Sequence, residues 1–299
     1  MSRVLDVYLQ ESLVGTLEQT SGGELIFSYE ADYLNRAAYG ISLSLPLQTE
    51  PFKGPQIKAF FSGLLPEESV RERLAGYLGL SEKNPFALLE VVGGDCAGAL
   101  ALYPHGETPS KISHDVEALN NKQLKEILEL IKRRPMLAGD DGYRLSLAGA
   151  QDKLAVGFRD GQVVLMKGGA PTTHILKPII ERVKDSVHNE LFCMKLAKRV
   201  GLDVPEVSLH FAADTPYYLV ERYDRRVDTD GVVRRIHQED FCQALGVAPE
   251  MKYEREGGPS IVACQDVIAK HSARPAADQI KFLNIILFNY IIGNADAQG

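Results

Sequence analysis

The sequence predicts an α+β protein built from two units. A chain of 299 residues is longer than one hydrophobic core usually supports. Strand-like alternation and helical spacing of apolar residues both occur, and the polar stretch at residues 105–115 contains Pro109. We therefore expect a small α+β unit in residues 1–105. A second unit in residues 116–299 should begin with strands and end in helices.

The first unit opens with a predicted hairpin. Apolar residues flank the polar turn at residues 10–12. Asn84 followed by Pro85 is a typical helix start, and Gly93 followed by Gly94 is a typical end. The other expected elements of this unit are a strand at residues 24–29, helices at residues 56–65 and 67–78, and a closing strand at residues 97–103.

The second unit alternates strands with helices before it becomes helical. A turn at Asp160 and Gly161 predicts a hairpin, and Gly201 predicts the end of a helix. This order resembles the layout of protein kinases, although many α+β proteins share it. The expected elements are a helix at 116–133, hairpin strands at 144–159 and 162–166, a strand at 174–177, a helix at 187–200, strands at 206–212 and 217–221, a charged segment at 221–226, and helices at 238–245, 260–271 and 277–292.

Composition and charge exclude several classes of protein. Apolar residues make up 45% of the chain, which is typical of a packed globular protein. The net charge of −7 argues against a chain that coats nucleic acid by itself. The four cysteines lack zinc-site spacing, and no signal pattern or membrane-length apolar run is present. We therefore expect a cytoplasmic protein that has no contact with a membrane.

The segment Ser-Leu-Ala-Gly-Ala-Gln-Asp-Lys at residues 146–153 is a candidate phosphate-binding loop. Small side chains let backbone N–H groups approach phosphate oxygens, and Lys153 supplies a positive charge. The segment has neither the Walker A spacing nor the glycine pattern of ordinary protein kinases. A bulged hairpin with an Ala-Gly kink is the alternative interpretation.

Lys177 ends an apolar strand and is a candidate phosphate-binding lysine. Glu190, inside the following helix, is a candidate partner that would hold Lys177 in place. The alternatives are an edge-strand lysine that reaches solvent and a solvated helix glutamate.

Two further segments are candidates for nucleotide binding and catalysis. The charged segment that begins at Glu221 follows an apolar strand, so its backbone can bind an adenine edge while Tyr223 packs on the ring. A surface cluster of ion pairs is the alternative. Asp296 lies in a small-residue loop after an apolar helix, where an aspartate can accept a proton from an attacking hydroxyl. An ordinary helix C-cap and turn is the alternative there.

Together these segments resemble the HipA family of serine/threonine protein kinases. The resemblance rests on the Ala-Gly-Ala-Gln-Asp-Lys run, the Thr-His-Ile-Leu-Lys strand and the Val-Glu-Arg-Tyr-Asp-Arg-Arg segment. His-Gln-Glu-Asp-Phe-Cys-Gln at 237–243 and Leu-Ser-Leu-Pro-Leu at 43–47 also match, so it extends over the whole chain. The resemblance implies a kinase-like, two-lobed second unit, related to HipA and phosphoinositide 3-kinases, of which this chain holds only part of the helical lobe.

The resemblance also implies a role for each matching position. Asp296 would be the catalytic base, and Ser146 the serine that the kinase phosphorylates on itself, which ejects the phosphate loop. The expected cofactors are ATP and Mg²⁺. Residues implied to bind ATP are Ala148, Gly149, Ala150, Gln151, Asp152, Lys153, Lys177, Glu221, Arg222, Tyr223 and Gln298.

The sequence departs from the family pattern in two places. Gln298 stands where the family has histidine, and glutamine donates a hydrogen bond without carrying charge. The Lys-Asn pair and the later aspartate that supply metal ligands in the family are expected beyond Gly299, so no metal ligand is expected within this chain.

The resemblance implies partners as well. Family members phosphorylate protein serines, glutamyl-tRNA synthetase being the best-known target, and thereby inhibit translation. They are neutralised by a small helix-turn-helix antitoxin, and they approach DNA only through or alongside it. Two alternatives stay open: a catalytically incompetent or truncated relative that binds antitoxin as a corepressor, and a small-molecule kinase.

Overall fold

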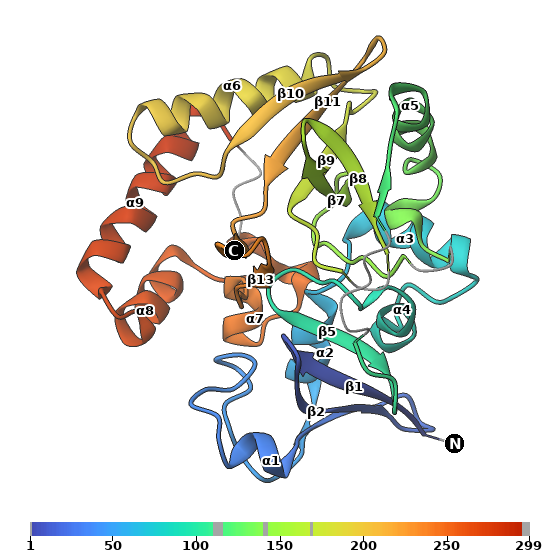
Figure 1. Ribbon diagram of the computed structural model, residues 1–299. Coiled ribbons are helices and arrows are strands. Elements are labelled where there is room, and N and C mark those ends of the chain that lie inside the picture. Colours follow the sequence, from blue (N-terminus) through green and yellow to red (C-terminus); the bar gives the residue numbers. More distant parts are fainter. Residues whose placement is uncertain (1, 110–115, 140–142, 168–169, 295–299) are drawn as a thin grey trace.

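The first unit is an antiparallel sheet with helices packed against it. The computed structural model describes residues 2–109, 116–139, 143–167 and 170–294. The elements of the first unit are β1 (Arg3–Leu9), β2 (Ser12–Gln19), β3 (Leu25–Tyr29), α1 (Ala31–Leu34), β4 (Phe52–Lys53), α2 (Pro55–Ser62), α3 (Glu68–Leu78), α4 (Pro85–Val92) and β5 (Leu100–Pro104). The strand order is β4-β3-β2-β1-β5. Of these strands, β2, β1 and β5 are labelled in Figure 1. Buried Phe60, Leu74 and Phe86 join α2, α3 and α4 to the sheet in one core.

The second unit contains a larger antiparallel sheet, in the order β10-β11-β9-β7-β8-β6. Its core includes Leu154, Leu176 and Leu219, one from each of three neighbouring strands. The elements of this part are β6 (Val116–Ala118), α5 (Asn121–Leu130), the 3₁₀ turn η1 (Pro135–Leu137), β7 (Leu154–Arg159), β8 (Gln162–Met166), β9 (His174–Pro178), α6 (Ser186–Arg199), β10 (Val207–Ala212), β11 (Thr215–Glu221), and the hairpin strands β12 (Arg225–Val227) and β13 (Val233–Arg235).

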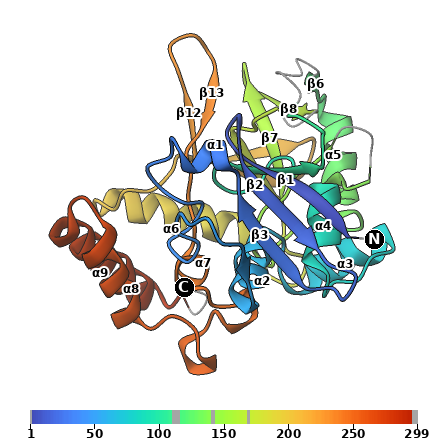
Figure 2. The ribbon, with the colours of Figure 1, turned by 90° about the horizontal axis from the view of Figure 1, so that it is seen from below.

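The chain after β13 is helical, and it extends to one side of both sheets (Figures 1 and 2). Its elements are α7 (Phe241–Leu245), the turns η2 (Pro249–Met251) and η3 (Glu254–Glu256), α8 (Ile261–His271) and α9 (Pro275–Ile292). The side-chain amides of Gln265 and Gln279 join α8 to α9 through each other's backbone carbonyls, at 3.4 and 3.3 Å. Leu283 and Tyr290 of α9 are exposed. Within the described ranges, no helix is long and apolar enough to cross a membrane.

The structure corrects two predicted elements and adds one. Residues 116–118 form β6 rather than the start of a helix, because they pair with β8; the helix begins after Asn120, which caps it together with Gln123. The first hairpin strand begins at Leu154 instead of residue 144, because the preceding residues run along the first unit. The charged segment after β11 continues into the unpredicted hairpin β12–β13, which projects from the molecule (Figure 2).

A buried ion cluster joins the two units. Asp95 of the first unit is fully buried and lies 2.8 Å from Arg225, 2.9 Å from Arg235 and 3.4 Å from Arg222. Asp224 pairs with Arg222 at 2.7 Å. Burial by itself raises the pKa of Asp95, but the three arginines outweigh it and hold that pKa well below its ordinary value. We call these five side chains the junction cluster.

Candidate active site

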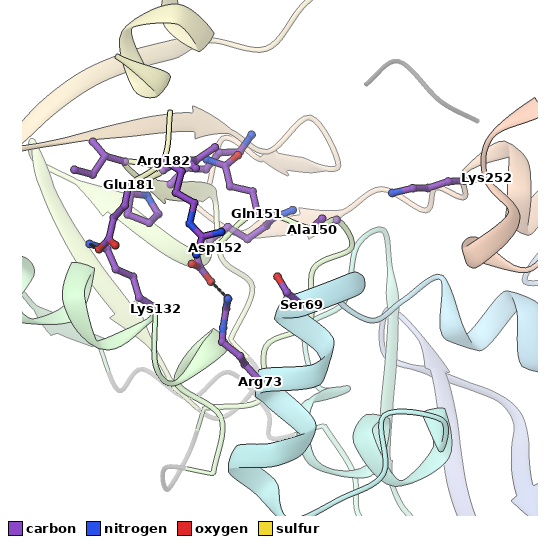
Figure 3. A pocket seen from close by; sticks show the side chains of 15 residues that line it. Ser69, Arg73, Lys132, Ala150, Gln151, Asp152, Glu181, Arg182 and Lys252 are labelled. Carbon is purple, nitrogen blue, oxygen red and sulfur yellow. Dashed lines mark hydrogen bonds and ion pairs between the residues drawn. The ribbon is translucent and has the colours of Figure 1, made fainter. Parts of the chain in front are cut away.

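A cavity of about 840 Å³ lies where the two units meet. Its walls come from α3 of the first unit, the 149–153 loop, the end of β9 with the residues after it, and the segment before η3 (Figure 3). The lining residues are Ser69, Arg73, Lys132, Gly149, Ala150, Gln151, Asp152, Lys153, Lys177, Pro178, Ile179, Ile180, Glu181, Arg182 and Lys252.

The lining of the cavity is strongly basic, although the whole chain is acidic. Six of the lining side chains are lysine or arginine, and only Asp152 and Glu181 are acidic. A concentration of one charge sign in a concave site raises the local concentration of ligands of the opposite charge. The cavity therefore suits an anionic ligand, and its volume is within the range of small-molecule sites.

Lys177 is fixed at the edge of this cavity by a glutamate from the neighbouring helix. It lies on β9, and its Nζ is 2.5 Å from Oε1 of Glu190 on α6. The same Nζ lies 5.7 Å from the centre of the buried Tyr218 ring on β11. Protein kinases use a strand lysine held by a helix glutamate to place a positive charge against nucleotide phosphates.

Gly149 and Lys153 shape the loop that faces Lys177. Gly149 has a φ of +102°, and a Cβ there would lie 2.5 Å from Nζ of Lys153. That Nζ donates to the carbonyl of Ala148 at 2.5 Å. Burial, and then the positive charge of Lys177, lower the pKa of Lys153 to about 8. The loop therefore holds a cation close to its own backbone.

Ser146 is turned away from the cavity. It is fully buried, and its hydroxyl donates to the carbonyl of Leu64 in the first unit at 2.6 Å. In this conformation the hydroxyl has a partner and no access to solvent, so its modification would require the loop to move.

The predicted adenine-binding residues lie outside the cavity lining. The guanidinium of Arg222 is buried in the junction cluster, where Asp224 and the carbonyl of Cys96 accept its hydrogen bonds. Glu221 and Tyr223 are exposed, Tyr223 to 68%. The backbone N–H of Arg222 donates to the carbonyl of Thr173 at 2.9 Å, and its carbonyl accepts from the N–H of Arg225 at 3.1 Å. The adenine role of this segment stays a prediction.

Asp296 and Gln298 lie outside the described residues. The described part of the chain before them contains α9, which Gly293 caps in the left-handed conformation. Among the described residues, no group of three histidine, cysteine or carboxylate side chains is placed to hold a metal ion.

Several lining residues escaped prediction from the sequence. Arg73 belongs to the first unit, Lys132 follows α5, Arg182 follows β9 and Lys252 lies between η2 and η3. Lys132 begins a short basic run at residues 132–134, and none of the four segments has a recognisable phosphate-binding pattern. Only folding brings them beside the 149–153 loop, so no local signal in the sequence could have identified them.

The fold and the cavity together define a protein of the kinase-like class, with an antiparallel sheet, a lysine–glutamate pair and a basic cavity beside it. The chain belongs to the HipA family. The family model for the HipA N-terminal domain matches residues 5–103, and the model for the HipA-like C-terminal domain matches residues 145–297. The predicted fold class and the predicted family are thereby confirmed.

Relatives and a solved structure resemble the chain over almost its whole length. "Putative kinase Y4mE" of Sinorhizobium fredii is 46% identical over 302 residues, covering 99% of this chain and 72% of the relative. "Serine/threonine-protein kinase toxin HipA" of Shewanella oneidensis is 30% identical, covering 99% and 70%. A solved complex of HipA, HipB and operator DNA from Shewanella oneidensis matches with a TM-score of 0.83 at 30% identity, covering 99% of this chain and 71% of that one.

Proposed function

We propose that this chain is an ATP-dependent serine/threonine protein kinase. The observation that carries the proposal is the Lys177–Glu190 pair at the edge of a basic cavity, beside the loop that contains Gly149. This arrangement is the one that phosphoryl transfer requires of a protein: fixed positive charge around a polyphosphate. The names of the relatives, which include kinases, support the same class of reaction.

The proposed roles follow from position in the cavity. The 148–153 loop would hold the phosphates with its backbone, and Lys153 and Lys177 would neutralise them. Asp296 would accept the proton of the attacking serine hydroxyl. Mg²⁺ supplies further neutralisation of phosphate charge in such reactions, and we assign none of its ligands to the described residues.

We also propose that the kinase acts as a toxin. The solved complex from Shewanella oneidensis contains HipA with HipB and operator DNA. A helix-turn-helix antitoxin would bind this chain in the same way, and DNA contact would come through that antitoxin. The proposed target is a serine of a cytoplasmic protein, such as an aminoacyl-tRNA synthetase, whose modification inhibits translation.

Self-phosphorylation of Ser146 belongs to the same proposal. The hydroxyl is buried against Leu64, so the loop must leave the first unit before Ser146 reaches a phosphate donor. Phosphate adds about −1.5 to −2 charges at neutral pH, which the buried position cannot accept. The modified loop would therefore stay out and lower the affinity for ATP.

Two variants test the proposed kinase, measured on the full-length protein. Lys177→Ala should weaken ATP binding at least about tenfold in calorimetry, because it removes a charge-assisted contact with phosphate. Asp296→Asn should abolish transfer of radiolabelled phosphate while ATP still binds, because the base acts in the transition state. Lys184→Ala, at an exposed lysine outside the cavity, is the control. Wild-type ATP affinity in Lys177→Ala would contradict the proposal.

A further inference from the structure

The proposed phosphate loop and the residues before it form hydrogen bonds with the first unit at several positions. The N–H of Ser146 donates to the carbonyl of Asp95 at 3.1 Å, and its hydroxyl donates to Leu64. Further along, the N–H of Glu67 donates to the carbonyl of Gly149 at 3.3 Å. The loop is therefore folded against the first unit, which supplies part of the cavity wall as well.

The last of these contacts is an ion pair between the two units. Arg73 of α3 binds Asp152 of the loop, and both side chains line the cavity (Figure 3). Both are partly exposed, Arg73 to 37% and Asp152 to 22%, so the pair is open to a ligand on one side. Among the described residues, Nε of Arg73 is buried without a hydrogen-bond partner. The pair is thus an element of the cavity wall rather than of the core.

The negative charge of the Asp152 carboxylate is unfavourable in a site that binds phosphates. A negative charge a few ångströms from bound phosphates opposes their binding. Of the other cations near it, Lys132 is paired with Glu129 and Glu181 at 3.0 and 2.9 Å, and Lys153 donates to the carbonyl of Ala148. Arg73 is the ion-pair partner of Asp152 in the described part of the chain.

We infer that Arg73 is a positioning residue of the anion site, supplied by the first unit to neutralise and orient Asp152 in the phosphate loop. This inference deepens the proposed kinase function and rests on it. The first unit then contributes to ligand affinity, through one side chain that acts on the loop. The pair lets an acidic residue lie in the loop without repelling the phosphates.

A double-mutant cycle tests this role, with binding of ATP and of inorganic tripolyphosphate measured by calorimetry. Arg73→Gln leaves Asp152 unneutralised and should weaken both ligands on the order of tenfold. Asp152→Asn leaves the positive charge of Arg73 uncompensated beside the loop, so this variant should bind both ligands more tightly than the wild type. The double variant should return to within about twofold of the wild type, since both charges are gone. Lys58→Gln, at an exposed lysine of α2 outside the cavity, controls for loss of one positive charge.

Other results of these measurements would contradict the inference, the proposed kinase function or both. A double variant that binds as weakly as Arg73→Gln would overturn the inference, because Arg73 would then bind the phosphates directly. Arg73→Gln with the affinity of Lys58→Gln would overturn it as well. A wild type that binds tripolyphosphate but not ATP would contradict the proposed kinase, while the cycle with tripolyphosphate would still decide the inference. A wild type that binds neither ligand would overturn both.

Discussion

The junction cluster and the cavity contain the same kinds of charged residue in opposite environments. At the junction, Asp95, Arg222 and Arg225 are buried, and Asp95 pairs with both of these arginines and with Arg235. In the cavity, the Arg73–Asp152 pair and Lys177 are partly exposed. A buried cluster of paired charges fixes the arrangement of two units and is not accessible to a ligand. A partly exposed cluster lines a cavity that a ligand can enter.

Neither charge density nor residue type by itself identifies a binding site in this molecule. The Glu-Arg-Tyr-Asp-Arg-Arg segment is the most charged run of the second unit, yet Arg222 and Arg225 hold the junction together. The isolated Lys177 faces the cavity. A cation can bind a ligand where its side chain is exposed and where partners within the protein do not fully occupy it.

The largest effect should come from the junction. Asp95→Ala should lower the free energy of unfolding by about 3–5 kcal/mol, because it leaves buried arginines without their shared carboxylate. Urea denaturation followed by circular dichroism measures the change. Asp214→Ala removes an acid whose pair with Lys125 is on the surface, and it should leave the denaturation midpoint unchanged. Equal effects of the two substitutions would mean that burial does not distinguish the clusters.

Substitutions of two glycines distinguish the effect of backbone strain from a specific effect on the phosphate loop. Gly149→Ala and Gly161→Ala both place a side chain at positive φ, +102° and +78°, and each should cost about 1–2 kcal/mol of stability. Only the Cβ at position 149 meets a neighbour within 4 Å, the amine of Lys153. ATP affinity should therefore fall in Gly149→Ala and stay at the wild-type value in Gly161→Ala. Loss of affinity in both variants would show that the loop is not specifically involved.

The smallest effect is a pH dependence of binding that only the cavity should show. Lys153 has a pKa lowered to about 8, so it is protonated below that pH and neutral above it. ATP affinity should fall severalfold as pH rises from about 7 to about 9, because the phosphates lose one cation. Lys153→Gln should flatten this profile, whereas Lys58→Gln should keep it. An unchanged profile in Lys153→Gln would assign the pH dependence to another group.

Local sequence signals predicted the elements of the fold well where the stabilising contacts join residues that are close together in the sequence. The turn at Gln10 and the cap at Asn84 lie where expected, because turn and cap chemistry involve residues only a few positions apart. The prediction of a helix from residue 116 was wrong, because Val116 pairs with Met166, 50 positions away in the chain. Strand pairing over that distance has no local signature.

The sequence by itself determined the family and the two adjacent elements that carry Lys177 and Glu190. Only the tertiary structure decided which charges are buried and which face the cavity. Arg225 lies 130 positions from Asp95, and Arg73 lies 79 positions from Asp152. The physical reason is desolvation. An arginine that the fold buries stabilises the structure through its ion pairs, whereas an arginine that stays in contact with water can attract a ligand.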